Sequence, residues 1–133
     1  MADGAGVQVS GDLGSKPDVT LPAGEAPTEL VVVDLAEGDG AEVAAGATVT
    51  THYVGKSWST GQQFDASWDR GEPISFPLSG VIAGWTQGIP GMKVGGRRLL
   101  IIPPDLGYGD QSPTPAITPG ETLAFVIDLV DVR

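Results

Sequence analysis

The sequence predicts an α+β fold in which a curved antiparallel β-sheet of about five strands wraps around one short α-helix. Three observations lead to this prediction: runs of β-branched and aromatic residues recur, the connections between them are short, and only one segment has apolar residues at helical spacing. Short connections favour antiparallel strands, because parallel strands need long crossovers. The 133 residues, 41% of them hydrophobic, are enough for one domain with a single core.

The strands are predicted from residues that suit a pleated, half-buried surface. The clearest is Thr48 to Val54, in which Val49, Thr51 and Tyr53 share one face while His52 faces the other way. In chain order, strands are predicted at residues 30–35, 48–54, 97–102 and 123–130, with shorter extended segments at 64–65 and 74–76.

One short helix is predicted at residues 81–89, with Ser79 as its N-cap. Gly84 and Gly88 within it each cost about 1 kcal/mol relative to alanine. A helix this short would not form alone in water, so packing against the sheet must hold it.

Residues 1–27 are predicted to be an acidic, proline-containing N-terminal extension, and residues 28–133 the folded domain. The extension has three prolines and no apolar stripe longer than a few positions. Acidity is uneven along the chain, since residues 1–45 carry nine of the 17 acidic side chains and one lysine. The predicted domain is therefore closer to neutral than the whole chain.

Composition excludes several classes of function. A net charge of −10 and a pI near 4.2 argue against a nucleic-acid partner, which needs clustered Lys and Arg. No run of about 18 apolar residues is present, so no membrane span is expected. The absence of cysteine excludes disulfides and thiolate chemistry. Because the first residues lack the basic and apolar stretches of a signal peptide, we expect a cytoplasmic protein; the alternative is an exported protein whose leader has been removed. Nothing requires more than a monomer.

Conventional catalytic and metal-binding sets are missing from the sequence. None of the serines lies in a Gly-x-Ser-x-Gly turn. The single histidine, His52, lies within a predicted strand, where a structural role is expected. Asp65, Asp69 and Glu72 lack the ligand spacing of a calcium loop, so surface charge is the preferred interpretation. We therefore expect neither a metal nor a cofactor.

What remains is a concentration of aromatic residues where the predicted sheet and helix meet. Two interpretations are open, because plain core packing and an apolar ligand pocket would both gather such residues. The residues concerned are Tyr53, Phe64, Trp85, Tyr108 and Phe125, together with Val81, Ile82 and Ile117.

Seven short motifs occur in order along the chain. They are HYVG at 52–55, GQQFDASWDR at 61–70, VIAGW at 81–85, GMKVGGRR at 91–98, IPP at 102–104, YG at 108–109 and TLAF at 122–125. In this order they resemble the FKBP family of peptidyl-prolyl cis-trans isomerases, which also bind macrolides such as tacrolimus and rapamycin. The resemblance covers about residues 28–133 and implies an FKBP-like fold.

The resemblance also implies a pocket for proline-containing polypeptides and macrolides. A tyrosine and a Phe-Asp pair would form its walls and the helix tryptophan its floor, while the Ile82 amide N–H and the Tyr108 hydroxyl would donate hydrogen bonds to the ligand. The residues implied to bind are Tyr53, Phe64, Asp65, Ile74, Val81, Ile82, Trp85, Tyr108, Ile117 and Phe125, and those implied to be catalytic are Asp65, Ile82, Trp85 and Tyr108.

The sequence departs from the familiar family pattern in three places. Ile74 stands where a pocket phenylalanine is common, which would remove a ring from one wall. The connection at 76–81 is shorter than in eukaryotic members, and the flap at 111–116 is rich in proline, with no bulky apolar residue before Ile117. These differences are expected to affect macrolide affinity and the preferred residue before proline, and to leave the activity intact.

The predicted function is peptidyl-prolyl cis-trans isomerisation during protein folding. Rotation about an amide has a barrier of ~18–20 kcal/mol because it breaks C–N resonance, so a site need only favour the twisted amide. No nucleophile is needed, since no bond is made or broken. The alternative is a non-catalytic, chaperone-like module that only binds proline-containing partners.

Overall fold

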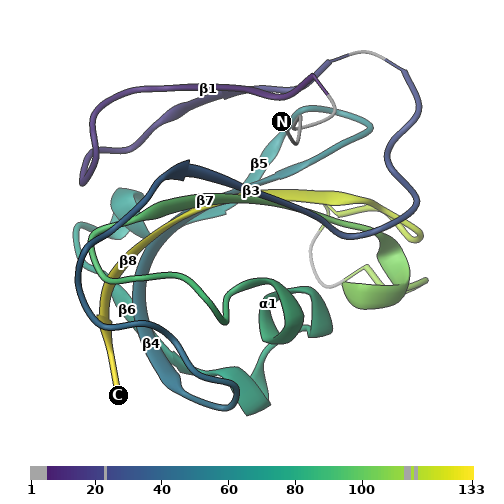
Figure 1. Ribbon diagram of the computed structural model, residues 1–133. Coiled ribbons are helices and arrows are strands. Elements are labelled where there is room, and N and C mark those ends of the chain that lie inside the picture. Colours follow the sequence, from purple (N-terminus) through teal and green to yellow (C-terminus); the bar gives the residue numbers. More distant parts are fainter. Residues whose placement is uncertain (1–5, 23, 113–114, 116) are drawn as a thin grey trace.

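The fold consists of a small hairpin, a larger sheet and short helical segments (Figure 1). The computed structural model describes residues 6–22, 24–112, 115 and 117–133. The strands β1 (Gln8–Ser10) and β2 (Asp18–Thr20) form the hairpin, and the larger sheet contains β3 (Val31–Ala36), β4 (Thr48–Ser57), β5 (Gln63–Ala66), β6 (Ile74–Pro77), β7 (Arg97–Ile102) and β8 (Leu123–Val132). The helical segments are α1 (Ala83–Gly88) and the 3-10 turns η1 (Ser67–Arg70), η2 (Leu78–Gly80) and η3 (Pro104–Leu106).

All strand pairs of the larger sheet are antiparallel, in the order β3-β7-β8-β4-β5, and β6 also pairs with β4. On one side of β4, its first half pairs with β6 and its second half pairs with β5, so one long strand has two short strands as neighbours. Register shifts in β4, at Thr50/Thr51 and Gly55/Lys56, increase the local twist. The curved antiparallel sheet that the sequence predicts is confirmed, with six strands among the described residues.

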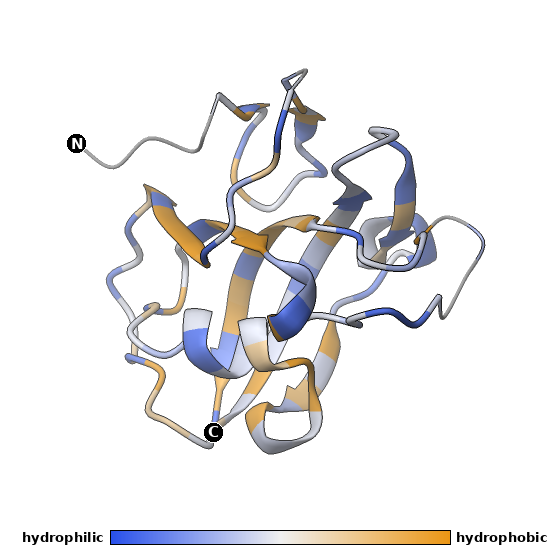
Figure 2. Ribbon diagram, turned by 90° about the vertical axis from the view of Figure 1, so that its right-hand side faces the viewer, coloured by the Kyte–Doolittle hydropathy of each residue, from blue (hydrophilic) through white to orange (hydrophobic). Residues whose placement is uncertain are grey.

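The two faces of the sheet are both apolar, and different parts of the chain cover them. The helix α1 lies against the concave face (Figure 1), where Tyr53, Leu100 and Phe125 belong to one buried cluster. The hairpin covers the opposite, convex face, where Val19 and Leu99 belong to a second cluster. Figure 2 shows apolar strand segments, in orange, between the hairpin and the helical part of the molecule. Strands buried on both sides explain the nearly unbroken apolar runs of β7 and β8.

The helix is shorter than the sequence predicts. The pattern predicts a helix over 81–89 with Ser79 as N-cap, but α1 begins two residues later and Ile82 occupies the N-cap position. Val81 and Ile82 are extended, with φ and ψ of −120° and 175° and of −60° and 150°. Their β-branched side chains suit an extended backbone better than a first helical turn. Within the described ranges, no helix is long and apolar enough to cross a membrane.

The N-terminal extension packs onto the sheet instead of projecting from it. In the described range 6–22, Val19 is only 5% exposed. Val7, Val9 and Leu21 are partly buried against the same cluster. Each three-residue strand contains only one of these apolar positions, Val9 in β1 and Val19 in β2, so they form no recognisable stripe in the sequence. The domain boundary after residue 27 stays a prediction.

Gly84 and Gly88 bring α1 close to the sheet. A Cβ added at Gly84 would lie 2.5 Å from the Ile102 side chain, and one at Gly88 would lie 2.7 Å from Leu100. The two residues that disfavour an isolated helix are therefore its points of closest approach, and packing outweighs helix propensity. Arg98 supports the C-terminal end of α1 by donating a hydrogen bond to the Gly88 carbonyl at 2.8 Å.

Gly84→Ala is expected to destabilise the fold. The new methyl group would collide with Ile102, and such overpacking costs about 1–3 kcal/mol, against the roughly 1 kcal/mol that alanine gains over glycine in a helix. Urea denaturation should show a lower free energy of unfolding. Gln87→Ala, at an exposed position of α1, is the matched control and should be neutral or slightly stabilising. An equal loss in both variants would contradict the close approach.

Candidate functional site

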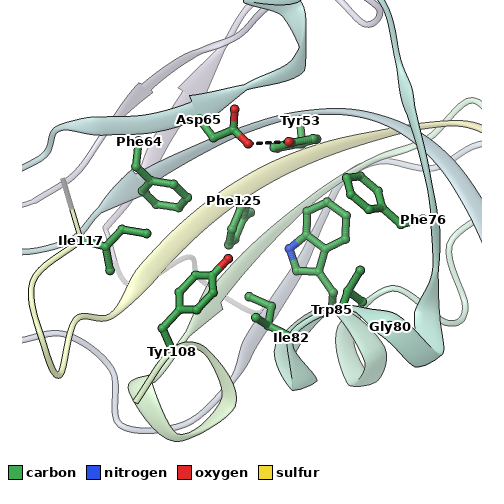
Figure 3. A pocket seen from close by; sticks show the side chains of 11 residues that line it. Tyr53, Phe64, Asp65, Phe76, Gly80, Ile82, Trp85, Tyr108, Ile117 and Phe125 are labelled. Carbon is green, nitrogen blue, oxygen red and sulfur yellow. Dashed lines mark hydrogen bonds between the residues drawn. The ribbon is translucent and has the colours of Figure 1, made fainter. Parts of the chain in front are cut away.

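A cavity of about 590 Å³ lies between α1 and the concave face of the sheet (Figure 3). Strands β4, β5, β6 and β8 contribute to its walls, and α1 with the segment before it contributes the floor. The lining residues are Tyr53, Phe64, Asp65, Phe76, Gly80, Val81, Ile82, Trp85, Tyr108, Ile117 and Phe125.

Trp85 stands at the centre of an aromatic cluster. Its ring lies 5.4 Å from Tyr53, 5.3 Å from Phe76 and 5.4 Å from Phe125, at interplanar angles of 83°, 79° and 85°. These edge-to-face arrangements are the favourable ones for aromatic pairs, because a positive ring edge meets a negative ring face. Three such contacts fix the orientation of the indole that forms the floor.

The indole N–H of Trp85 has no hydrogen-bond partner among the described residues, although it is buried. In Figure 3 the nitrogen lies on the side of the ring toward Ile82 and Phe125. A buried donor without a partner costs about 1–3 kcal/mol. Ring packing therefore sets the position of Trp85, and hydrogen bonding does not.

A glycine makes room for two rings on the wall formed by β4, β5 and β8. A Cβ at Gly55 would lie 2.5 Å from the Phe64 ring and 2.8 Å from the Phe125 ring. The two rings contact each other edge to face, with centroids 5.4 Å apart. Any other residue at position 55 would displace part of this wall.

The polar part of the wall is a network of three side chains. The Tyr53 hydroxyl donates to Asp65 Oδ2 at 2.5 Å, and Arg70 Nη1 donates to Asp65 Oδ1 at 2.6 Å. Arg70 Nη2 also donates to the Tyr53 hydroxyl oxygen at 3.0 Å. Both carboxylate oxygens are thus engaged, which fixes the carboxylate at the edge of the cavity.

The network keeps Asp65 ionised and Tyr53 neutral. Burial alone would raise the pKa of Asp65, but the hydrogen bonds from Tyr53 and Arg70 outweigh burial and hold that pKa below its ordinary value. Burial, aided by the hydrogen bond to Asp65, raises the pKa of Tyr53 to about 12. Folding therefore favours the ionised form of Asp65, which adds to the free energy of unfolding. This gain is fully present above the unfolded-state pKa of Asp65, and it is lost as the pH falls through the lower, folded-state pKa.

Two hydrogen-bond donors lie at the rim of the cavity. The Tyr108 hydroxyl points into the cavity (Figure 3), and the residue is 36% exposed. Partial burial, together with the negative charge of Asp65, raises the pKa of Tyr108, so its hydroxyl remains a donor at neutral pH. The amide N–H of Ile82 precedes α1, and none of the described residues accepts a hydrogen bond from it. Both donors are available to a ligand.

The structure brings nine of the ten predicted binding residues to this one cavity. The exception is Ile74, which is partly buried against the core but does not line the cavity. Phe76, two positions later on the same face of β6, supplies a ring that contacts Tyr53 and Trp85. The expected absence of a ring from this wall is therefore corrected: the wall keeps an aromatic residue, because Phe76 is the residue of β6 that lines the cavity and packs on Tyr53 and Trp85.

Besides Phe76, sequence reasoning missed Arg70, which pairs with Asp65. It closes the motif at 61–70, but a lone arginine in a polar turn is typical of surface charge, and nothing in the spacing links it to Tyr53. His52 lies on the convex face, where its ring stacks on Trp68 with centroids 4.9 Å apart, as a structural histidine would. No group of three or more His, Asp or Glu residues that could hold a metal ion occurs in the part of the chain that the structure describes.

These features define a class of site. Its lining is aromatic and aliphatic, with an ion-paired carboxylate as the one charged side chain that the described residues supply, and its rim carries two donors. Over the same described ranges, no serine, histidine or lysine lines the cavity, so none of their side chains is placed for nucleophilic attack. Such a pocket suits an uncharged, ring-containing ligand, which places the protein in the class that binds an apolar group in an aromatic pocket without covalent chemistry.

Known proteins with similar sequences and structures belong to one family. The model of the FKBP-type peptidyl-prolyl cis-trans isomerase family matches residues 40–130. A probable FK506-binding protein of Corynebacterium glutamicum is 53% identical over 115 residues, covering 86% of this chain and 97% of that protein. An FK506-binding protein of Streptomyces anulatus is 57% identical over 120 residues, covering 88% of this chain and 97% of that protein. The crystal structure of FkpA from Escherichia coli matches with a TM-score of 0.72 at 42% identity, covering 82% of this chain and 51% of that chain.

The chain belongs to the FKBP family of peptidyl-prolyl cis-trans isomerases. The family, the fold class and the isomerase activity that the sequence predicts are thereby confirmed. Its substrates are accordingly proline-containing polypeptides. The roles of individual pocket residues stay predictions.

Arg70→Leu is expected to raise the pKa of Asp65. The substitution removes a hydrogen bond and a positive charge that both favour the carboxylate, while burial, which favours the neutral acid, remains. A carbon-13 NMR titration of the Asp65 carboxyl group measures the change. Lys93→Met removes a cation that pairs with Glu37 instead, and it should leave this pKa unchanged. Equal shifts in both variants would mean that net charge, and not the direct ion pair, sets the value.

Proposed function

We propose that this chain catalyses Xaa-Pro isomerisation by seating the proline ring on Trp85 and stabilising the twisted amide without covalent chemistry. The observation that carries the proposal is the edge-to-face cluster around Trp85, beside one ion-paired carboxylate. Because the rings hold one another, the cavity keeps its shape without a ligand. Little binding free energy is then lost to ordering the site.

The apolar lining would favour the twisted amide by removing water. A planar amide has the larger charge separation between nitrogen and oxygen, and water stabilises that separation through hydrogen bonds to the carbonyl. The twisted amide has no such resonance, so it gives up less hydration free energy when it leaves water. A cavity that excludes water thus binds the transition state in preference to the ground state, which is the requirement for catalysis.

We assign Asp65 an electrostatic role. Tyr53 and Arg70 already occupy its oxygens, and the low pKa leaves it a poor base. A fixed negative charge at the edge of the cavity can instead stabilise the polarised carbonyl carbon of the twisted amide. The donors of Tyr108 and Ile82 would hold the flanking backbone of the substrate.

Trp85→Leu is expected to lower kcat/KM for an Xaa-Pro peptide by about tenfold or more, since 1.4 kcal/mol of lost transition-state binding gives a factor of ten. A protease-free isomerisation assay measures the rate. Val130→Thr, at an exposed position of β8, is the control and should retain wild-type activity. A non-catalytic binding module would bind the peptide without accelerating it, so no acceleration by the folded wild-type protein would exclude the isomerase mechanism.

We further propose that macrolides bind in the same cavity. The relatives from C. glutamicum and S. anulatus are named for FK506 binding, and FK506 is tacrolimus. Because Phe76 keeps one wall aromatic, we no longer expect Ile74 to reduce the affinity for macrolides. The monomeric state stays a prediction. A cytoplasmic location stays a prediction.

Rapamycin is expected to inhibit the isomerase in competition with the peptide. Phe76→Leu should weaken rapamycin binding by about two- to tenfold, because it removes the edge-to-face pair with Trp85, and such a pair contributes about 0.5–1.5 kcal/mol beyond its buried area. Calorimetry measures the affinity. Ile74→Val, on the same strand but outside the cavity, should leave it unchanged; a larger decrease from Ile74→Val than from Phe76→Leu would contradict the assignment of this wall.

A further inference from the structure

The wall that carries Phe64 and Asp65 has little support from the sheet. It belongs to β5, an edge strand whose one partner among the described strands is β4, at three positions with a register shift. The turn η1 follows directly and ends at Arg70, whose guanidinium pairs with Asp65. The position of η1 therefore decides how Arg70 meets the carboxylate.

Two side chains of η1 are held by the N-terminal segment. Trp68 Nε1 donates to the Gly14 carbonyl at 3.1 Å, and Lys16 Nζ donates to Asp69 Oδ1 at 2.7 Å. The other oxygen of Asp69 accepts a hydrogen bond from Gln63 Nε2 of β5 at 2.8 Å. Asp69 thus connects the N-terminal segment to the strand that carries Asp65.

The loop at residues 11–16, between β1 and β2, is itself fixed by a buried ion pair. Arg97 and Asp128, on the convex face of β7 and β8, are 3% and 6% exposed and are joined by bonds of 2.6 and 2.9 Å. Arg97 also donates to three carbonyls of the loop, and the Gly14 amide donates to Asp128 Oδ2 at 2.9 Å. The Arg97 guanidinium carbon lies 5.9 Å from the ring centre of Trp68. The Arg97–Asp128 ion pair therefore contacts both the loop at 11–16 and the turn η1, and holds them together.

We propose that this loop is a positioning element of the active site: through Trp68 and Asp69 it fixes η1, and thereby holds Arg70 against the Asp65 carboxylate. The loop is not itself among the residues that line the cavity, so it acts through other groups and is not catalytic. The inference rests on the electrostatic role proposed for Asp65.

The similar proteins support a link between the N-terminal segment and the domain. The matches to the C. glutamicum and S. anulatus proteins cover 86% and 88% of this chain, more than residues 28–133 make up. Part of the segment before residue 28 is therefore included in both matches. The family model, by contrast, begins at residue 40.

A pair of glycine substitutions tests the proposal in the full chain. Gly14 and Gly46 have φ of +83° and +77°, and an added Cβ at either position would meet nothing within 4 Å. The Cβ of valine at either position therefore meets the same backbone strain without a collision of its own. Gly14→Val should distort the loop, whereas Gly46→Val strains a turn before β4 and controls for reduced stability. Hydrogen exchange of the Trp68 indole proton reports whether the loop is released.

In Gly14→Val we expect faster exchange of that indole proton, a higher pKa of Asp65 by carbon-13 NMR, and a kcat lower by about three- to tenfold, which corresponds to about 0.7–1.4 kcal/mol. KM should change less than about twofold, because the apolar lining is intact. Gly46→Val should match the wild type in all four measurements, apart from a lower thermal midpoint.

Trp68→Phe is the second variant, because it keeps a ring on His52 and removes the indole N–H that binds the Gly14 carbonyl. If this variant folds and the pKa of Asp65 is unchanged, the proposal is overturned, and the hairpin then only stabilises the fold. A raised pKa with unchanged kcat supports the coupling and overturns the role given to Asp65. These two failures are therefore distinguishable.

Discussion

The site depends on the point where β4 changes its partner. β6 pairs with β4 up to Thr51 and β5 pairs from Val54 onward, so the two residues between them lack a neighbouring strand on that side. Ser67, at the start of η1, fills the gap: its hydroxyl oxygen accepts a hydrogen bond from the Tyr53 amide at 2.7 Å and lies 3.3 Å from the Tyr53 carbonyl oxygen. A fully buried serine thus replaces two bonds of the ladder. The same atom that satisfies the backbone of Tyr53 anchors the turn that ends in Arg70.

A reaction without bond making asks for a rigid, dry cavity rather than for reactive groups. Each factor of ten in rate requires about 1.4 kcal/mol of preferential transition-state binding, so a millionfold requires ~8 kcal/mol. Desolvation, one fixed carboxylate and two rim donors are of the right size to supply this together. Their effect depends on geometry that is set before the substrate arrives. The rings packed around Trp85 meet that condition, and so does the Asp65 carboxylate, which accepts a hydrogen bond at each oxygen.

Periodicity and motif order predicted most of the fold and most of the pocket. The strand at 97–102 has the predicted bounds, because all six of its residues are buried and two prolines follow it directly. Ile74 was misplaced because it shares a face of β6 with Phe76, and the alternation of the strand does not tell which of the two lines the cavity. The hairpin at 6–22 was missed because its buried residues are few and scattered, and its main contacts are backbone carbonyls, which no side-chain pattern reveals.

The buried ion pair on the convex face explains why the hairpin has one position. Apolar contacts such as those of Val19 would hold it on the sheet, but they are tolerant of sliding, since they depend on area and not on direction. Arg97 and Asp128 would incur a large desolvation cost if the loop simply covered them. That cost is offset only when the loop's carbonyls and the Gly14 amide meet the pair in one register. Stability thus comes from the apolar cluster, and the register that carries the loop to η1 comes from the charges.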